Sequence, residues 1–308
     1  VYKRQTSVFA PIYSVCCMAT RLLIVFLRAL GCLPLSWVRG FGWLVGRVLF
    51  LFLAKRRHIV RTNLRLCFPE KGEAEREALA KDVFVKFCQS SLDRGWLWHA
   101  SPRTLEKRLK FSGDVAALQP TTPQQPTIAF CPHFFGLDAG AVALSLWIPR
   151  DYITIYARQL DSVADEWIKA GRLRFGSVKM LARDEGVKPV VSLLRKGGFL
   201  YLLPDMDFGR SESLFVPFFG VPTATVPSLP RFARLGRAQV VSLIARLTPT
   251  GYDIHISPVW SDYPTDDAEA DTRLMNERLE AEIRKTPSQY YWVHKRFKTR
   301  PEGDAGFY

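Results

Sequence analysis

The chain of 308 residues is long enough to bury one large hydrophobic core or two modest ones. Hydrophobic residues make up 48% of it and charged residues 23%, a composition that excludes an intrinsically disordered protein. Lysine and arginine exceed aspartate and glutamate by 43 to 29, and the resulting charge of +14 favours an anionic partner such as a membrane surface, a phosphorylated lipid or an acidic carrier protein.

The first predicted element is an N-terminal helical segment that binds a membrane. Residues 1–20 are treated as a leader of unknown order and are left out of the fold. From Leu22 to Ala54 the chain is almost entirely apolar, but arginines interrupt it, and no unbroken run reaches the roughly 18 residues of an easy spanning helix. Pro34 divides the stretch, and Ser36 is well placed to cap a second helix.

Basic residues follow the apolar stretch at once: Lys55, Arg56, Arg57, Arg61 and Arg65. The positive-inside rule assigns such a run to the cytoplasmic side. We therefore expect residues 21–66 to form a membrane-anchoring segment, either a shallowly inserted helix pair or one tilted span. A buried helical hairpin of a soluble protein is the alternative. A cleaved signal peptide fits less well, because the apolar part is long and a basic run follows it.

Residues 67–308 are predicted to form one catalytic domain. A polar helical stretch runs from Glu73 to Trp98, and short apolar runs then alternate with amphipathic helical ones. The predicted strands are Thr127–Cys131, Tyr152–Tyr156, Phe199–Leu203, Gln239–Ala245 and Tyr252–Ile256. The predicted helices are Leu137–Trp147, Ser162–Gly171, Gly186–Arg195, Ser228–Leu235 and Asp267–Lys285. Strands separated by helices favour an α/β fold with a mostly parallel mixed sheet flanked by helices.

The cysteines show no CxxC or Cys/His metal spacing, and only Cys16 and Cys17 are close in sequence. Three of the six lie in or beside apolar segments, where a free thiol behaves as a small buried hydrophobe. We expect all six to be reduced and the catalytic domain to lie in the cytoplasm.

The sharpest local feature is His133, which follows a buried predicted strand and precedes Gly136 and Asp138. The histidine and the aspartate cannot share one face of a single helix, since five steps turn about 140°. They can meet if His133 lies in the strand-to-helix loop and Asp138 in the first helical turn. The carboxylate would then fix the imidazole tautomer, and the other ring nitrogen would take a proton from a hydroxyl. The plain alternative is a core histidine capped by a neighbouring carboxylate.

A second feature is the loop after the predicted strand Phe199–Leu203, which carries Asp205, Asp207, Gly209 and Arg210. Arg210 could bind a sugar phosphate while the aspartates order the loop. Two carboxylates without a third ligand give thin support to a metal site, so no metal is expected. A polar turn with a capping aspartate is the alternative.

Three phenylalanines close to three prolines form the third feature: Phe215, Phe218 and Phe219. They would make a stiff apolar wall that suits an acyl chain, although such stretches more often belong to the core.

Four arginines follow the His133 helix along the chain: Arg158, Arg172, Arg174 and Arg183. Arginines near such a site commonly bind phosphates or carboxylates in a bidentate manner, whereas solvated surface arginines are the alternative. Arg158 is the strongest candidate, because it stands at the end of a predicted strand.

Together these segments resemble the late acyltransferases of lipid A biosynthesis, the lauroyl/myristoyl type, within the glycerophosphate acyltransferase superfamily. The resemblance runs from about Leu22 to Tyr308 and includes His133 and Asp138 as the HX4D/E box, where relatives often carry glutamate. The other matching strings are Asn63-Leu64, Cys67-Phe68-Pro69, Pro204 to Gly209, Phe215 to Gly220 and Trp292 to Gly303. The last of these is the most specific.

The resemblance implies an enzyme at the cytoplasmic face of the inner membrane of a Gram-negative bacterium. It would transfer a fatty acyl group from acyl carrier protein to a hydroxyl of a 3-hydroxyacyl chain on the Kdo-bearing lipid A precursor, with His133 as general base and Asp138 as its orienting group. An alcohol needs such a base at neutral pH, and the oxyanion formed from the thioester needs donors such as Arg158 or backbone N–H groups. No cofactor is expected. The expected partners are the carrier protein, the phosphorylated glycolipid and the membrane, and no nucleic acid.

Two other functions remain open. A different acyltransferase, acting on glycerophosphate or another glycolipid, would share the His133 box but would not need the string from His294 to Pro301. A non-enzymatic lipid-binding protein would explain the apolar N-terminal segment and the charge, but it would leave His133 without a role.

Overall fold

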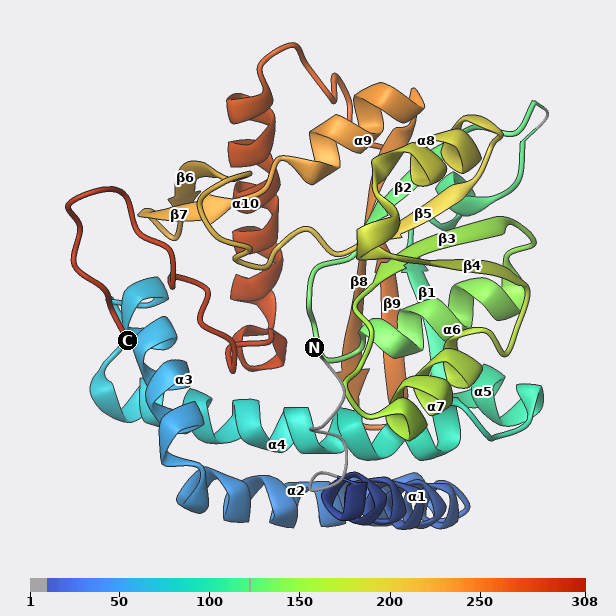
Figure 1. Ribbon diagram of the computed structural model, residues 1–308, viewed down its shortest axis with the longest axis vertical. Helices are drawn as coiled ribbons and strands as arrows, with labels where there is room; N and C mark the ends of the chain where they lie inside the picture. Colours follow the sequence, from blue (N-terminus) through green and yellow to red (C-terminus); the bar gives the residue numbers. More distant parts are fainter. Residues whose placement is uncertain (1–9, 122) are drawn as a thin grey trace, which may run out of the picture.

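The computed structural model describes residues 10–121 and 123–308 (Figure 1). The helices are α1 (Ala10–Gly31), α2 (Leu35–Phe52), α3 (Ala54–Cys67), α4 (Glu73–Leu97), α5 (Pro102–Arg108), α6 (Leu137–Trp147), α7 (Ser162–Arg172), α8 (Val187–Arg195), α9 (Ser228–Gly236) and α10 (Ala268–Lys285). The strands are β1 (Leu109–Gly113), β2 (Thr127–Phe130), β3 (Asp151–Tyr156), β4 (Ser177–Ala182), β5 (Phe199–Leu202), β6 (Leu214–Phe218), β7 (Val221–Thr225), β8 (Gln239–Thr248) and β9 (Gly251–Ile256).

A seven-stranded sheet forms the centre of the molecule, with the strand order β1-β9-β8-β2-β5-β3-β4. Every neighbouring pair is parallel except β8 and β9, which are antiparallel. This confirms the mostly parallel mixed sheet predicted from the sequence. The central strands β2 and β5 are buried at every residue, as expected of strands covered on both faces.

Right-handed crossovers distribute the helices over both faces of the sheet. The chain passes from β2 through α6 to β3 and from β3 through α7 to β4, whereas α8 carries it back in the opposite direction to β5. Helices α6 and α7 therefore cover one face. Helix α8 covers the other, where it packs against β3, β5 and α9 (Figure 1).

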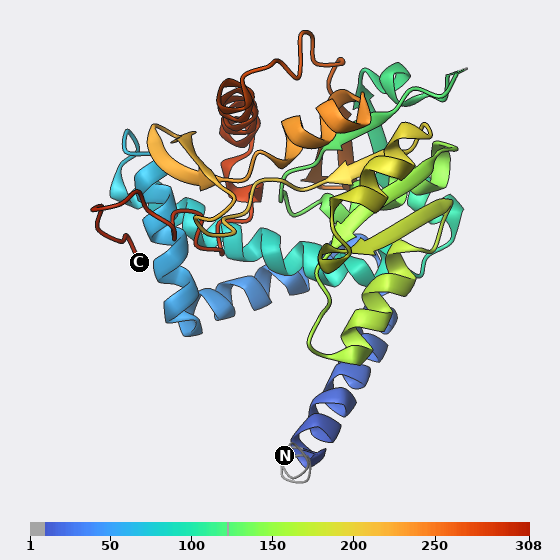
Figure 2. The ribbon, with the colours of Figure 1, turned by 45° about the horizontal axis from the view of Figure 1, so that its top comes forward.

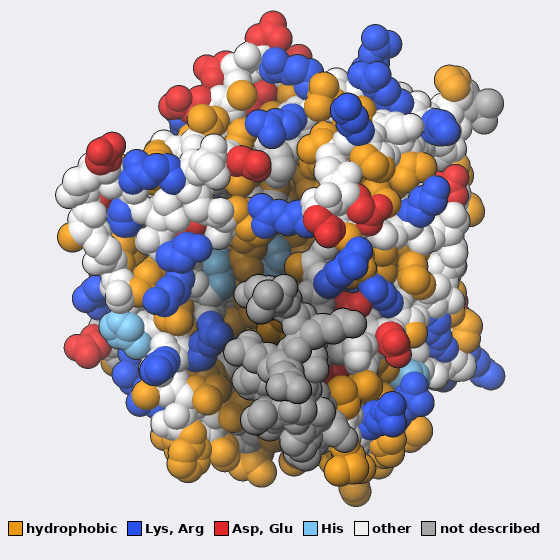
Figure 3. Space-filling view, viewed as in Figure 1, with side chains coloured by type: hydrophobic (Ala, Val, Ile, Leu, Met, Phe, Trp, Pro, Cys, Tyr) orange, Lys and Arg blue, Asp and Glu red, His pale blue; other side chains and the backbone are white. Residues whose placement is uncertain are grey.

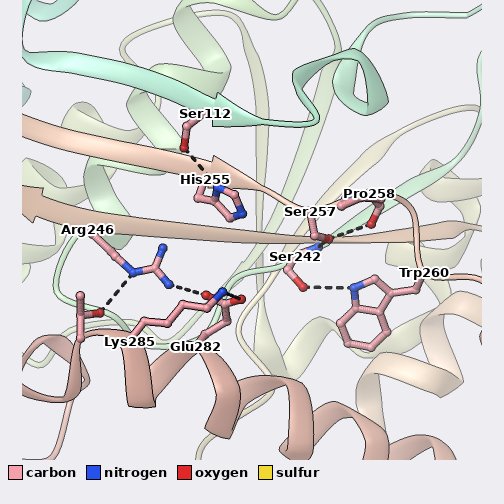
Figure 4. Close-up of polar contacts among 10 residues, drawn as sticks. Ser112, Ser242, Arg246, His255, Ser257, Pro258, Trp260, Glu282 and Lys285 are labelled. Atoms are coloured by element: carbon pink, nitrogen blue, oxygen red, sulfur yellow. Dashed lines mark hydrogen bonds and ion pairs between the residues drawn. The ribbon is translucent and has the colours of Figure 1, made fainter.

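Charged side chains fasten α10 to β8. Figure 4 shows Arg246 of β8 pointing toward Glu282, which also pairs with Lys285 at 2.8 Å. Beside them the indole N–H of Trp260 donates to the Ser242 hydroxyl at 3.1 Å, which ties the segment after β9 back to β8. The small β6–β7 hairpin packs against α10.

All five predicted strands, the five predicted helices that follow residue 136 and the helical stretch that starts at Glu73 are confirmed, with ends within three residues of those expected. The sequence missed β1 and β4, the two edge strands of the large sheet, because each is short and only partly apolar on its buried side. It also missed the β6–β7 hairpin, where Pro217 and Pro222 face each other. Proline removes a ladder donor and hides a strand signal.

The N-terminal helices form a layer along α4. Ser36 does not cap α2 as predicted; it lies inside the helix, and Pro34 occupies the N-cap position without a capping side chain. With φ −54° and ψ 138°, Pro34 is already extended, so the proline itself separates the two helices. The leader boundary at residue 20 falls within α1, and residues 1–9 lie outside the described part.

The cysteines behave as the sequence predicted wherever their side chains are described. Cys17, Cys32, Cys67, Cys88 and Cys131 are all free. Cys67, Cys88 and Cys131 are buried in the apolar interior, so these three thiols act as small hydrophobic side chains.

Candidate active site

The register of β2 and β5 brings His133 and Asp205 together. In this parallel pair Phe130 lies opposite Leu202, and the N–H of Cys131 continues the ladder to the Leu202 carbonyl at 2.8 Å. His133 and Asp205 each follow three residues beyond that pair. Both therefore leave the sheet at the carboxyl ends of adjacent strands, where α/β sheets hold their sites.

Asp205 accepts hydrogen bonds from both the ring and the backbone of His133. The Nδ1 to Oδ1 distance is 2.7 Å, and the His133 backbone N–H donates to Oδ2 at 2.9 Å. The Tyr290 hydroxyl donates to the same Oδ2 at 2.9 Å. Burial alone would raise the pKa of the fully buried Asp205, but the charge and hydrogen bonds of His133 outweigh it and lower the pKa to about 2.

This geometry prepares His133 for proton transfer. An ionised Asp205 fixes the proton on Nδ1, which leaves the Nε2 lone pair to accept one. Nε2 makes no hydrogen bond to any residue in 10–121 or 123–308, and the side chain is 21% exposed. Figure 3 shows a hollow in this face of the molecule with histidine on its floor and Lys and Arg side chains around it.

Asp138 has different partners from those predicted. It lies in the first turn of α6, as expected, but its carboxylate binds Arg94 of α4 at 2.9 Å and Arg172 of α7 at 3.0 Å. Burial would raise the pKa of Asp138, but these two guanidinium groups outweigh it and lower the pKa. The predicted bond from Asp138 to His133 is not formed within the described residues, because α6 directs this carboxylate toward α4 and α7; Asp205 holds the imidazole instead.

Two further arginines stand near the carboxyl ends of the neighbouring strands. Arg158 is exposed two residues beyond the end of β3 and makes no hydrogen bond with the described part of the chain. Arg183 follows β4, and its guanidinium carbon lies 3.9 Å from the centre of the Phe208 ring. Arg174, by contrast, binds the backbone carbonyls of Leu97 and Ala100, which is a structural role.

Asp207 orders the loop after β5. Its carboxylate accepts from the Thr299 backbone N–H at 2.7 Å, from the Thr299 hydroxyl at 2.8 Å and from the Gly209 N–H at 2.9 Å. Gly209 has φ 97°, a conformation that other residues adopt only with strain. These contacts suit the loop-ordering role predicted for this aspartate, and they tie the loop to a residue 92 positions away.

Arg210 lies on the outer side of the same loop. Its guanidinium donates to the Arg300 carbonyl at 2.8 Å and lies 5.5 Å from the centre of the Phe215 ring. The residue is exposed, so the remaining donors of the guanidinium face solvent.

The three phenylalanines predicted to line an acyl pocket differ in burial. Phe218 is fully buried and its ring packs 6.0 Å from that of Phe297. Phe219 packs against Phe68 at 5.2 Å and is almost fully buried. These two side chains belong to the hydrophobic core, the alternative that the sequence left open, because they face inward at the end of β6. Only Phe215 is partly exposed.

The C-terminal string, taken from here on as residues 290–303, completes the site through contacts that were not predicted from the sequence. Besides the bond from Tyr290 to Asp205, the backbone N–H of Tyr291 donates to the His133 carbonyl at 2.9 Å. Asn63 of α3 holds the string in place by donating to the carbonyls of Trp292 and His294 at 2.7 and 2.8 Å. The only signal in the sequence was that Asn63 and the string from Trp292 to Gly303 were both part of the family resemblance.

His294 is half-buried and stacks on Tyr291. Its ring is nearly parallel to the Tyr291 ring at 5.9 Å, and Nδ1 donates to the Tyr291 carbonyl at 2.8 Å. Nε2 is buried without a hydrogen-bond partner among the described residues. Burial lowers the pKa of His294 to about 4, so the ring is neutral at neutral pH.

Residues 3–299 match the model of a protein family described as bacterial lipid A biosynthesis acyltransferase. The chain belongs to this family. A lipid A biosynthesis acyltransferase of Haemophilus influenzae is 34% identical over 253 residues, which cover 81% of this chain and 78% of the relative. In Escherichia coli, a lipid A biosynthesis palmitoleoyltransferase is 31% identical over 280 residues (90% of each chain), and a lauroyltransferase 32% identical over 275 residues (88% of each).

Membership in the lipid A acyltransferase family confirms the resemblance drawn from the motifs. The protein is thus an acyltransferase of lipid A biosynthesis. The matched range contains the whole arrangement around His133, including Asp205, Tyr290 and Thr299.

Proposed function

We propose that the protein transfers a fatty acyl group from acyl carrier protein to a hydroxyl of a 3-hydroxyacyl chain on the Kdo-bearing lipid A precursor. The observation that carries the proposal is the 2.7 Å bond from His133 Nδ1 to the buried carboxylate of Asp205, which leaves Nε2 to act as a base. This arrangement suits the deprotonation of an alcohol, a step in which a positioned base contributes roughly two to four powers of ten in rate.

In the proposed reaction Nε2 of His133 takes the proton of the acceptor hydroxyl as its oxygen attacks the thioester carbonyl. The resulting oxyanion collapses, the carbon–sulfur bond breaks, and the carrier leaves as a thiol once its sulfur has taken the proton from the imidazolium. An ester forms, no covalent acyl-enzyme is needed, and His133 returns to its starting state. Asp205 stabilises the imidazolium between the two proton transfers.

The arginines take separate roles in this proposal. Arg158, exposed beyond β3, stabilises the developing oxyanion. Arg210 contacts a phosphate or sugar acid of the acceptor through the donors that face solvent. Asp138 is a positioning residue that holds Arg94 and Arg172. Because two positive charges meet one negative charge, this cluster keeps a net positive charge.

The proposed donor, acceptor and location also suit the charge of the molecule. A net charge of +14 favours both an acidic carrier protein and a phosphorylated glycolipid. The apolar N-terminal layer and the basic residues of α3 support attachment to the inner membrane with the catalytic domain on the cytoplasmic face.

The test is acyl transfer in washed membranes that contain the protein. Acyl carrier proteins loaded with acyl chains of several lengths are supplied together with the tetraacyl Kdo-bearing precursor, and the lipid product is weighed by mass spectrometry. We expect the product to gain one acyl group, and we expect a His133→Ala variant of equal expression to give none.

A parallel reaction with glycerol 3-phosphate tests the nearest rival. Acylation of glycerol 3-phosphate but not of the lipid A precursor would replace the proposed acceptor. If neither acceptor gains an acyl group from any carrier-bound chain, the transfer function itself is refuted.

A further inference from the structure

The helices α1 and α2 present a continuous apolar face that no described part of the protein covers. Figure 2 shows both helices on the outside of the molecule, with α1 projecting from it. The large hydrophobic side chains exposed on α2 and just after it are Trp37, Phe41, Trp43, Leu44, Val48, Leu51, Phe52 and Leu53. Among the described residues, α2 is the one helix long and apolar enough to cross a bilayer.

The opposite side of α2 is locked to the catalytic domain by a buried ion pair. The Arg39 guanidinium lies 2.8 Å from the carboxylate of Asp93 on α4, and Asp93 is fully buried. The same carboxylate accepts from the hydroxyl of Tyr252 on β9 at 2.6 Å. Removing Arg39 from this carboxylate would leave a buried charge without its partner, which is costly. Helix α2 therefore stays with the domain.

Glycines bring α2 into close contact with α4. The buried stripe of α2 repeats every four residues: Val38, Gly42, Gly46 and Phe50. A Cβ on Gly46 would lie 2.6 Å from the Val85 Cα, so the two backbones touch. Because the helices run side by side, a spanning α2 would take α4 into the hydrocarbon region with Lys81, Asp82 and Lys86, at a high cost in free energy.

Unpaired positive charges border the apolar face. Between α2 and α4 a cavity of about 290 Å³ is lined by Trp43, Arg47, Lys81 and Asp82, together with alanines and Val85. The Asp82 carboxylate lies 3.8 Å from the Lys86 ammonium. Arg47 and Lys81 remain the free charges of the lining, since neither has an acidic partner within 4.0 Å in residues 10–121 and 123–308. Exposed Lys55 and Arg56 follow at the start of α3. Cations beside exposed tryptophans complement the phosphate groups of an anionic lipid surface.

We propose that α2 lies parallel to the membrane, with its apolar face in one leaflet of an anionic bilayer and both of its ends on the same side. This deepens the membrane attachment in the proposed function and rests on it. The alternative is a helix that crosses the bilayer, for which the two ends of α2 would lie on opposite sides.

Cysteine labelling distinguishes the two arrangements in the full-length protein. Cysteines 16, 17 and 32 are replaced by serine, and Cys67, Cys88 and Cys131 stay because they are buried. Single cysteines are then introduced by Ser36→Cys at the start of α2 and by Lys55→Cys just after it. Leu160→Cys, a fully exposed position of the catalytic domain, reports which face is outside. Each variant is exposed to a membrane-impermeant maleimide in sealed inverted vesicles.

We expect all three positions to react without detergent. If position 36 or position 55 reacts only after detergent while position 160 reacts without it, α2 crosses the membrane and the proposal is overturned. Acyl transfer is measured on the same vesicles. A spanning helix in an active enzyme would refute only this arrangement, and in-plane labelling of an inactive enzyme would refute only the proposed function.

Spin labels give a second measurement that does not depend on maleimide access. Labels at Trp37→Cys, Leu44→Cys and Leu51→Cys lie along the outward face of α2. Equal and shallow depths, read from the relative accessibility to oxygen and to a water-soluble nickel complex, are expected for a helix in the plane. A label at position 44 that lies much deeper than the other two would overturn the proposal, as would three labels outside the lipid.

The anionic preference has its own test. With vesicles of phosphatidylcholine and phosphatidylglycerol, the double variant Arg47→Gln/Lys81→Gln should bind about 30-fold more weakly than the unmodified protein, since each such charge near an anionic surface contributes about 1 kcal/mol. The matched control is Arg231→Gln/Arg237→Gln, two exposed arginines on and just after α9, away from α2 (Figure 1). Equal binding by both double variants would refute the role of the α2–α4 cavity.

Discussion

At the scale of single residues, the site depends on a contact between two loops that local sequence spacing does not reveal. The HX4D spacing predicts a contact between a histidine in the strand-to-helix loop and an aspartate in the first turn of the helix, and the bounds of that helix are confirmed. The carboxylate that holds His133 comes instead from Asp205, 72 positions later. That pairing follows from β2 lying beside β5, and strand order is set by tertiary packing, not by short-range pattern.

The first prediction compares the two carboxylates near His133. Asp205→Asn should lower kcat by roughly a hundredfold to ten-thousandfold, because the amide cannot stabilise the imidazolium. Asp138→Asn should act mainly on substrate KM, because Asp138 holds Arg94 and Arg172 and does not contact the base. Steady-state kinetics on both variants, with folding checked by circular dichroism, gives the measurement. Unchanged kcat in folded Asp205→Asn protein would refute Asp205 as the partner of the base.

The second prediction uses the pKa of about 4 for His294 in the folded state. The unfolded chain binds a proton on this ring below about pH 6.5, whereas the folded protein does so only below about pH 4, so stability falls as the pH drops through this window. Between pH 7 and pH 5 the loss should be about 2 kcal/mol of unfolding free energy.

A His294→Leu variant should lack this part of the pH dependence. Urea unfolding of both proteins at pH 7 and pH 5 measures how much unfolding free energy each protein loses. Comparing the two losses removes the contribution of the other titrating groups, which both proteins share. Identical losses in the two proteins would show that the folded structure does not hold His294 as a neutral ring.

At the scale of elements, the helices and strands with a clear hydrophobic pattern of their own were predicted from the sequence. The elements that are stabilised mainly by contacts with distant segments were not. Helix α6 was predicted at its observed ends, because a mostly apolar run of good helix formers follows Gly136 and extends to Trp147. The edge strand β4 pairs on one side only, and its residues are mostly half-buried. The aromatic stretch around Phe218 was predicted to line an acyl chain. That Phe218 is buried in the core could not be predicted, because the segments that cover it, α10 and the C-terminal string, are distant in sequence.

The third prediction concerns the contact between α2 and α4, and it uses two glycines of the same helix as a matched pair. Gly46→Ala should destabilise the protein by roughly 1–3 kcal/mol, because the added methyl meets the backbone of Val85 at 2.6 Å. Gly40→Ala should stabilise it by up to about 1 kcal/mol, because nothing lies within 4 Å and alanine favours the helix.

Thermal unfolding of both variants in the same detergent measures the two shifts. Opposite signs are expected. A Gly46→Ala protein that is as stable as Gly40→Ala would mean that α2 is not held against α4 in solution.

At the scale of the whole molecule, the net charge of +14 should govern the encounter with an acidic donor. The fourth prediction is that KM for acyl carrier protein rises about tenfold or more when NaCl is raised from roughly 50 to roughly 500 mM, because salt screens the attraction. The same acyl group on pantetheine, a neutral donor, is the control and should show little change. Equal salt dependence for the two donors would exclude electrostatic recognition of the carrier.

The two carboxylates of the loop after β5 are both secured by the C-terminal string: Asp205 by Tyr290 and Asp207 by Thr299. Asn63, near the other end of the chain, holds that string in turn. During synthesis on the ribosome, the strands that precede His133 and Asp205 are made well before Tyr290 and Thr299. His133 and Asp205 therefore stay unsecured in the nascent chain until residues 290–299 have been made, so catalysis can begin only after this last part of the site is in place.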